Sequence, residues 1–79
     1  MNNLITFSGL EEIIRTAIKL SCFSASEIAE KICMSNSGMY CFTSGKNHIS
    51  VSKGDEIIDF LKSNCPMALQ AAINVYFNN

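Results

Sequence analysis

The sequence predicts an all-α domain of five short helices. Apolar residues recur at three- and four-residue spacing in successive segments, and a serine that can cap a helix stands before most of them. Glycine or proline falls between segments, where a helix must end or begin. The 79 residues suffice for one domain, and their 48% hydrophobic share indicates a packed core. A chain this short lies near the lower limit for an independent core, so we expect association with a second copy.

The first helix is expected to begin at Ser8, because Ser8 and Glu11 have the spacing of a capping box. It is expected to end near Leu20. Residues at helical spacing give this segment one apolar face, which consists of Leu10, Ile13, Ile14, Ala17 and Ile18.

The second and third helices are predicted to be short and separated by a tight turn. Ser24 and Glu27 form a second capping-box pattern, and Ser35 is placed to cap the third helix, which Gly45 ends. The second helix is expected to bury Ile28, Ala29 and Ile32, and the third to bury Met39 and Phe42. The outer surface of the third helix is then left to Asn36, Ser37, Tyr40, Cys41 and Thr43.

A fourth helix is expected to start at Ser50 or Ser52, and a fifth at Pro66. The fifth helix, over about 66–77, is apolar on almost every side, and one helix face cannot bury so many apolar side chains. This predicts a homodimer in which the fifth helix supplies the interface, through Leu69, Ile73, Tyr76 and Phe77.

The charge distribution favours a nucleic-acid partner more than the net charge of −1 does. No acidic residue lies between Glu30 and Asp55, whereas Lys31, Lys46 and Lys53 lie in or at the edge of that interval. This asymmetry predicts one basic face on the folded domain.

Other classes of protein find little support in the sequence. Cys22, Cys33, Cys41 and Cys65 are widely spaced without paired ligand motifs, so we interpret them as reduced thiols and expect no zinc site and no cofactor. His48 has no partner at triad or ligand spacing and is interpreted as a loop residue, so we expect no enzymatic activity. The absence of a signal-peptide pattern or a long apolar run predicts a cytoplasmic protein that does not enter a membrane.

The segment SASEIAEKICMSNSGMYCFTSGKN, residues 24–47, resembles the Cro/C1-type (XRE-like) helix-turn-helix family, most of all its lambda-repressor-like members. Ala29 matches the small residue of the first motif helix, Met34 the buried residue after the turn, and the run from Asn36 to Gly38 the opening of the recognition helix. The resemblance implies a single lambda-repressor-like domain over residues 1–79, with the motif at about 24–45. It also implies a phage- or mobile-element-type repressor that binds a palindromic DNA operator as a homodimer.

The resemblance and the chemistry of the side chains together imply a set of DNA contacts. Asn36 is expected to pair with a base edge, while Ser37 and Gly38 allow close approach. The alternatives are that Asn36 only assists the helix cap, that Tyr40 covers the second helix, and that the lysines are a solvated surface. Tyr40 and Cys41 on the outer face complete the expected contacts to base or sugar, and the expected phosphate contacts are Lys46, Asn47 and Lys53.

The sequence also departs from the family pattern. Ala25 stands where the family commonly has a glutamine that contacts a phosphate, and residues 1–7 carry no charged side chain. Cys33 stands at a glycine position in the turn, which costs about 1 kcal/mol if its φ is positive. The first departure favours a second hypothesis, a protein-interaction module that uses the same fold. Oxidation sensing by Cys41 is a further, weaker alternative.

Overall fold

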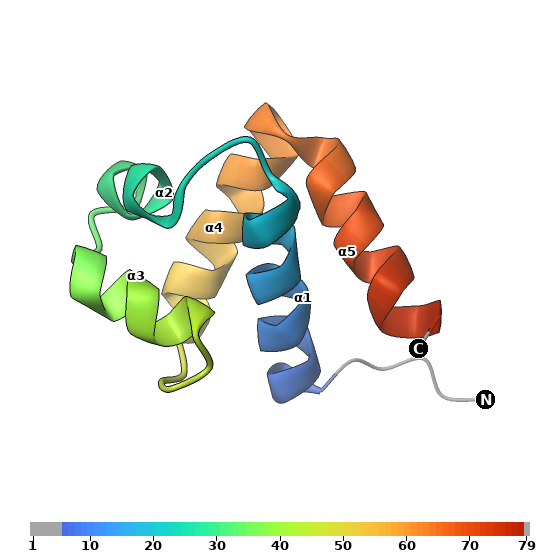
Figure 1. The fold of residues 1–79 in the computed structure, drawn as a ribbon, viewed down its shortest axis with the longest axis horizontal. Helices are drawn as coiled ribbons and strands as arrows, with labels where there is room; N and C mark the ends of the chain where they lie inside the picture. The colour runs from blue at the N-terminus through green and yellow to red at the C-terminus, as the bar shows by residue number, and fades with distance from the viewer. Residues whose placement is uncertain (1–5, 79) are drawn as a thin grey trace.

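The computed structural model describes residues 6–78 and confirms the all-α prediction (Figure 1). Residues 1–5, which include most of the uncharged amino-terminal segment, and residue 79 lie outside the described residues. Residues 6–78 contain no strand and form five helices, which are α1 (Phe7–Leu20), α2 (Ala25–Lys31), α3 (Asn36–Thr43), α4 (Val51–Asn64) and α5 (Pro66–Asn78).

The core lies where α1 meets the other helices, with α5 as its main neighbour and α2 and α3 on the opposite side (Figure 1). Small side chains line the contact between α1 and α5, since Ala17, Ala68 and Ala72 are all buried. The predicted inward residues of α2 and α3 are buried as well, including Ile28, Met39 and Phe42, each with no exposed surface. No helix within residues 6–78 is both long and apolar enough to cross a membrane.

The prediction for the start of α1 is wrong. Thr6, not Ser8, is the N-cap, and its hydroxyl oxygen accepts a hydrogen bond from the Gly9 amide at 3.0 Å. Glu11 therefore does not complete a capping box with Ser8, and its side chain is buried at 1% exposure instead. Burying a carboxylate is costly unless hydrogen-bond donors replace water, and here the donors come from His48 and Ile49 in the loop between α3 and α4.

The other three serine caps are as predicted. Ser24 and Glu27 form the complete capping box, with the Glu27 amide donating to Ser24 Oγ at 3.1 Å and the Ser24 amide to Glu27 Oε1 at 2.8 Å. Ser35 caps α3, and Ser50 rather than Ser52 caps α4. The starts of α2, α3 and α4 thus follow from local hydrogen bonding.

The α2 and α3 helices end in the same Schellman motif, once with cysteine and once with glycine in the left-handed position. After α2, the Cys33 amide donates to the Glu30 carbonyl and the Met34 amide to the Ala29 carbonyl, at 3.3 and 2.8 Å. After α3, the same two hydrogen bonds run from residues 45 and 46 to residues 42 and 41, at 3.0 and 2.9 Å. Cys33 has φ 57° and Gly45 has φ 87°, which confirms the glycine stop and gives Cys33 the strained conformation.

Candidate nucleic-acid interface

The first half of α3 presents a polar face to solvent. Asn36, Ser37 and Tyr40 are exposed, while Met39 and Phe42 on the other side of the helix are fully buried. Within residues 6–78 the side chains of Asn36 and Ser37 make no hydrogen bond, because Ser35 alone provides the cap. The amide of Asn36 therefore has its donor and its acceptor available for a ligand.

The helix cap at Ser35 accounts for the glycine at position 38. A Cβ at this position would lie 2.9 Å from the Ser35 hydroxyl oxygen, which accepts a hydrogen bond from the Gly38 amide at 3.1 Å. The residue is also only half-buried, so its predicted role in close approach of DNA is secondary to this local requirement.

Tyr40 contacts α2 through its hydroxyl group. The Tyr40 hydroxyl lies 3.3 Å from Ser26 Oγ, whereas the residue as a whole keeps 53% of its surface exposed. The Tyr40 hydroxyl therefore contacts α2, as one of the two interpretations expected, while the ring stays accessible for the other, a contact with a base or sugar.

The Lys53 ammonium group is engaged inside the domain. Its Nζ donates to the Ile32 carbonyl at the end of α2, at 2.6 Å, and lies 3.5 Å from a carboxylate oxygen of Glu56. A cation at the carboxyl end of a helix is favourably placed with respect to the helix dipole. This contact ties α4 to α2, and it gives Lys53 a structural role where a phosphate contact was expected.

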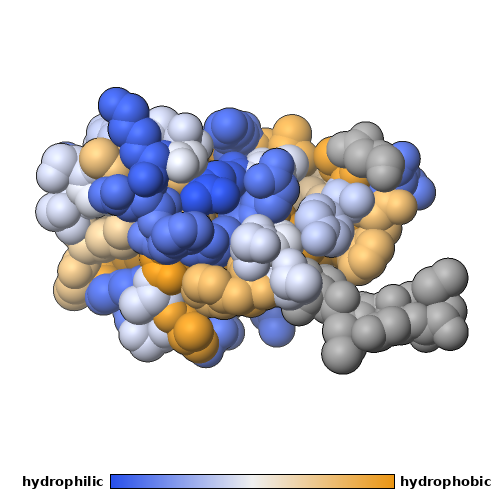
Figure 2. All heavy atoms as spheres, turned by 90° about the horizontal axis from the view of Figure 1, so that it is seen from below, coloured by the Kyte–Doolittle hydropathy of each residue, from blue (hydrophilic) through white to orange (hydrophobic). Residues whose placement is uncertain are grey.

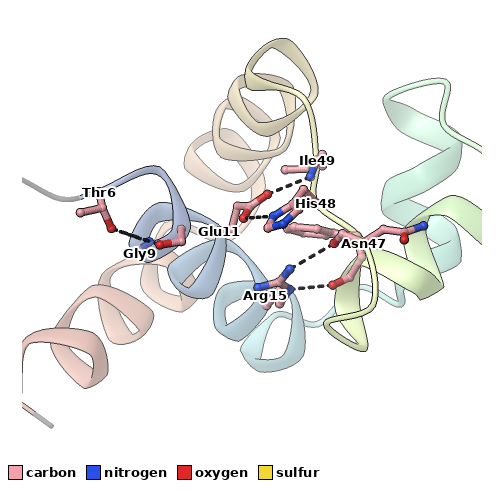
Figure 3. A network of polar contacts seen from close by, with 9 residues as sticks. Thr6, Gly9, Glu11, Arg15, Asn47, His48 and Ile49 are labelled. Carbon is pink, nitrogen blue, oxygen red and sulfur yellow. Dashed lines mark hydrogen bonds and ion pairs between the residues drawn. The ribbon is translucent and has the colours of Figure 1, made fainter.

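Arg15 on α1 holds the end of α3 in place, a role that sequence reasoning missed (Figure 3). Its Nε donates to the Phe42 carbonyl at 2.7 Å, and its second guanidinium nitrogen donates to the Asn47 carbonyl at 3.1 Å. The guanidinium also lies over the Phe42 ring, 4.7 Å from its centroid. The chain has a single arginine, which was the one available signal. Asn47 itself is exposed, so its side chain stays accessible.

Glu11 on α1 anchors the loop between α3 and α4 (Figure 3). One carboxylate oxygen lies 2.8 Å from His48 Nδ1, and the other accepts a hydrogen bond from the Ile49 amide at 2.9 Å. The hydrogen bond from His48, followed by that from Ile49, lowers the pKa of Glu11 despite the opposing effect of burial. His48 lies in the predicted loop with its imidazole mostly exposed, and through Glu11 it helps to position the loop that carries Lys46 and Asn47.

The two ends of α3 lie beside hollows whose lining residues carry opposite charge. A groove of about 390 Å³ between α2 and the start of α3 is lined by Ser26, Glu27, Glu30, Met34 and Asn36. A second hollow, of about 440 Å³, lies between α1 and the end of α3 and is lined by Lys19, Tyr40, Cys41, Thr43, Ser44 and Lys46. We call them the acidic groove and the basic hollow. Of the three lysines behind the predicted basic face, Lys46 lines the basic hollow, Lys53 is engaged inside the domain and Lys31 is exposed in the last turn of α2.

The α5 residues predicted for a dimer interface divide into two groups. Leu69, Ile73 and Tyr76 are half-buried and pack against the core of their own chain. Phe77 is 54% exposed, as is Val75 at 47% and Met67 at 82%. Figure 2 shows hydrophobic side chains on the side of the molecule where α5 lies. The accessible apolar surface of α5 therefore consists of Phe77 and two residues outside the predicted interface, Met67 and Val75.

The cysteines stay free thiols, Cys22 and Cys33 exposed and Cys41 and Cys65 half-buried. Within residues 6–78 no three histidine, cysteine, aspartate or glutamate side chains are placed to hold a metal ion together. Comparisons of the chain with protein-family models, with curated proteins and with solved structures found no match. The functional assignment therefore depends on the residues of this chain.

Proposed function

We propose that the chain is a sequence-specific DNA-binding transcriptional regulator of the helix-turn-helix type. The observation that carries the proposal is the outer face of α3, where Asn36 and Ser37 are exposed on a short helix that is locked to α1 and α2 from behind. A major groove admits one α-helix, and an asparagine amide can pair with both N6 and N7 of adenine. The α2–α3 pair, separated by residues 32–35, has the proportions of the two helices that place a recognition helix in that groove.

Dimerisation would increase the specificity of DNA recognition. Two copies joined through α5 would present two α3 helices to successive major grooves about 34 Å apart and would match a palindromic site. The exposed Phe77 and Val75 supply apolar surface for such a contact. Occupation of the site would exclude polymerase or a competing regulator, which is the action of a repressor.

The experiment is selection from random duplex DNA, followed by comparison of the enriched duplex with an unrelated one. Asn36→Ala is expected to cost about 1 to 3 kcal/mol on the enriched duplex and much less on the unrelated one, because base readout is lost while phosphate contacts remain. Asn64→Ala is the matched control, since Asn64 is an exposed asparagine on α4 whose amide donates only to the Phe60 carbonyl. An unchanged specificity ratio for Asn36→Ala, with the thermal midpoint preserved, would contradict the proposed role of α3.

The acidic groove favours a second candidate, a module that binds a basic segment of another protein. Glu27 and Glu30 line the groove directly beside Asn36, and a phosphate backbone would be repelled there. Ala25 also lacks the side chain with which the resembled family contacts phosphate. A selection that enriches no duplex, from protein with an intact thermal transition, would reject the first candidate in favour of this one.

A further inference from the structure

The basic hollow brings two cationic side chains together beside α3 without a carboxylate among its lining residues. Lys19 reaches it from the last turn of α1, and Lys46 from the turn that follows α3. Both lysines are exposed, and within residues 6–78 neither ammonium group has a hydrogen-bond or ion-pair partner. Unlike Lys53, they therefore have all their ammonium donors available for a ligand.

The end of a helix normally repels an anion, because its last carbonyl groups point outward. In α3 three carbonyls near this end, those of Tyr40, Cys41 and Phe42, already accept hydrogen bonds. The Tyr40 carbonyl accepts from the Ser44 amide and the Thr43 hydroxyl, at 3.0 and 3.2 Å. The Cys41 carbonyl accepts from the Lys46 and Asn47 amides at 2.9 and 3.2 Å, and from the Ser44 hydroxyl at 3.1 Å.

The Phe42 carbonyl accepts a hydrogen bond from a cation. The Phe42 carbonyl accepts from the Arg15 guanidinium at 2.7 Å as well as from the Gly45 amide at 3.0 Å. Three carbonyls at the end of α3 are therefore already hydrogen-bonded, one of them to the Arg15 cation. An anion in the hollow would meet the two lysines, and the Arg15 cation and the occupied carbonyls reduce the opposition of the helix dipole.

We propose that the basic hollow is the site where this domain binds a backbone phosphate of duplex DNA, with Lys19 and Lys46 as its two charged contacts. The proposal rests on the proposed function and adds a direction to it. A phosphate of the DNA backbone would lie beside the carboxyl end of α3 and the end of α1, while Asn36 at the start of α3 would face the base edges. Lys19, which the sequence analysis passed over, becomes a phosphate contact, and Lys53 does not.

The test measures the salt dependence of binding to the enriched duplex for the wild type, Lys19→Gln, Lys46→Gln and the double variant. Each released counterion contributes about 0.9 to the slope of log K against log salt concentration, so each single change lowers the slope by about 1 for each protomer bound. The double variant lowers it by about twice as much. All sequences should be weakened alike, because phosphate contacts carry no base information.

Lys62→Gln is the matched control, since Lys62 is an exposed lysine in the last turn of α4 that does not line the hollow. Its slope is expected to equal that of the wild type. Thermal midpoints of all variants should agree, because none of these side chains is buried.

The outcomes separate this inference from the function on which it rests. A wild type that binds a selected duplex while the double variant keeps the same slope would overturn the phosphate site and leave the DNA-binding function standing. The same follows if Lys62→Gln lowers the slope as much as the two hollow variants do. A wild type that binds no duplex at all at low salt would overturn both.

Discussion

Replacing Cys33 by glycine is expected to stabilise the fold. Cys33 occupies the left-handed position of the Schellman motif at the end of α2, with φ 57°. A side chain in this conformation costs about 1 to 2 kcal/mol, and glycine avoids that cost. Glycine in turn gives the unfolded chain more freedom, which offsets about 0.4 to 1 kcal/mol of the gain. The exposed thiol contributes no buried contact, so the middle of the two ranges predicts that Cys33→Gly raises the free energy of unfolding by about 0.5 to 1 kcal/mol.

The assay is thermal unfolding followed by circular dichroism, with all variants at one protein concentration because a dimer's midpoint depends on concentration. For a domain of this size, the expected gain raises the midpoint by about 2 to 8 °C. Cys33→Ala is the matched control, since it removes the thiol and keeps the strained Cβ, and it should leave the midpoint nearly unchanged. Gly45→Ala is expected to lower the midpoint. Gly45 has φ 87° and open space around it, so an added Cβ brings backbone strain without a steric clash. Equal midpoints for Cys33→Gly and Cys33→Ala would refute the argument from strain.

Three further predictions concern the contacts of α1 and α5. Because its hydrogen bonds in the fold lower the pKa of Glu11, its carboxylate contributes stability that is present above the ordinary glutamate pKa and lost as pH falls through the lowered, folded-state value. Glu11→Gln should therefore reduce the thermal midpoint near neutral pH and flatten its decline in acid; parallel curves for the two proteins would contradict this. Arg15→Met should lower the free energy of unfolding in a urea titration by about 1 to 3 kcal/mol, because the carbonyls of Phe42 and Asn47 lose a charged donor. A cost near zero would show that the guanidinium does not hold the end of α3. Phe77→Asp should shift sedimentation from dimer to monomer with an unchanged circular dichroism spectrum, because Phe77 is exposed on α5. A wild type that is already monomeric at tens of micromolar would remove α5 as an interface.

The candidate site could be predicted from the sequence where it depends on the exposed face of one helix. Asn36, Ser37 and Tyr40 follow from the cap at Ser35 and from helical spacing, since both determine which way a side chain points. The lysines could not be sorted in the same way. Lys46 and Lys53 look alike in the sequence, yet Lys53 donates to a carbonyl 21 residues away and Lys46 does not. Lys19 was overlooked because its neighbours in the basic hollow come from another helix.

By itself the sequence determined the helices and most of their ends. A serine hydroxyl that caps the amide three residues on, or a glycine that adopts positive φ after the last turn, acts within one turn of chain, so these signals are legible locally. The tertiary structure alone decided how the polar side chains of α1 are used. Ser8 and Glu11 have the same spacing as Ser24 and Glu27, but only the second pair forms a capping box. Glu11 lies on the buried side of α1, facing the Ile49 amide 38 residues further along the chain, and a buried amide without a partner costs more than an exposed helix cap contributes.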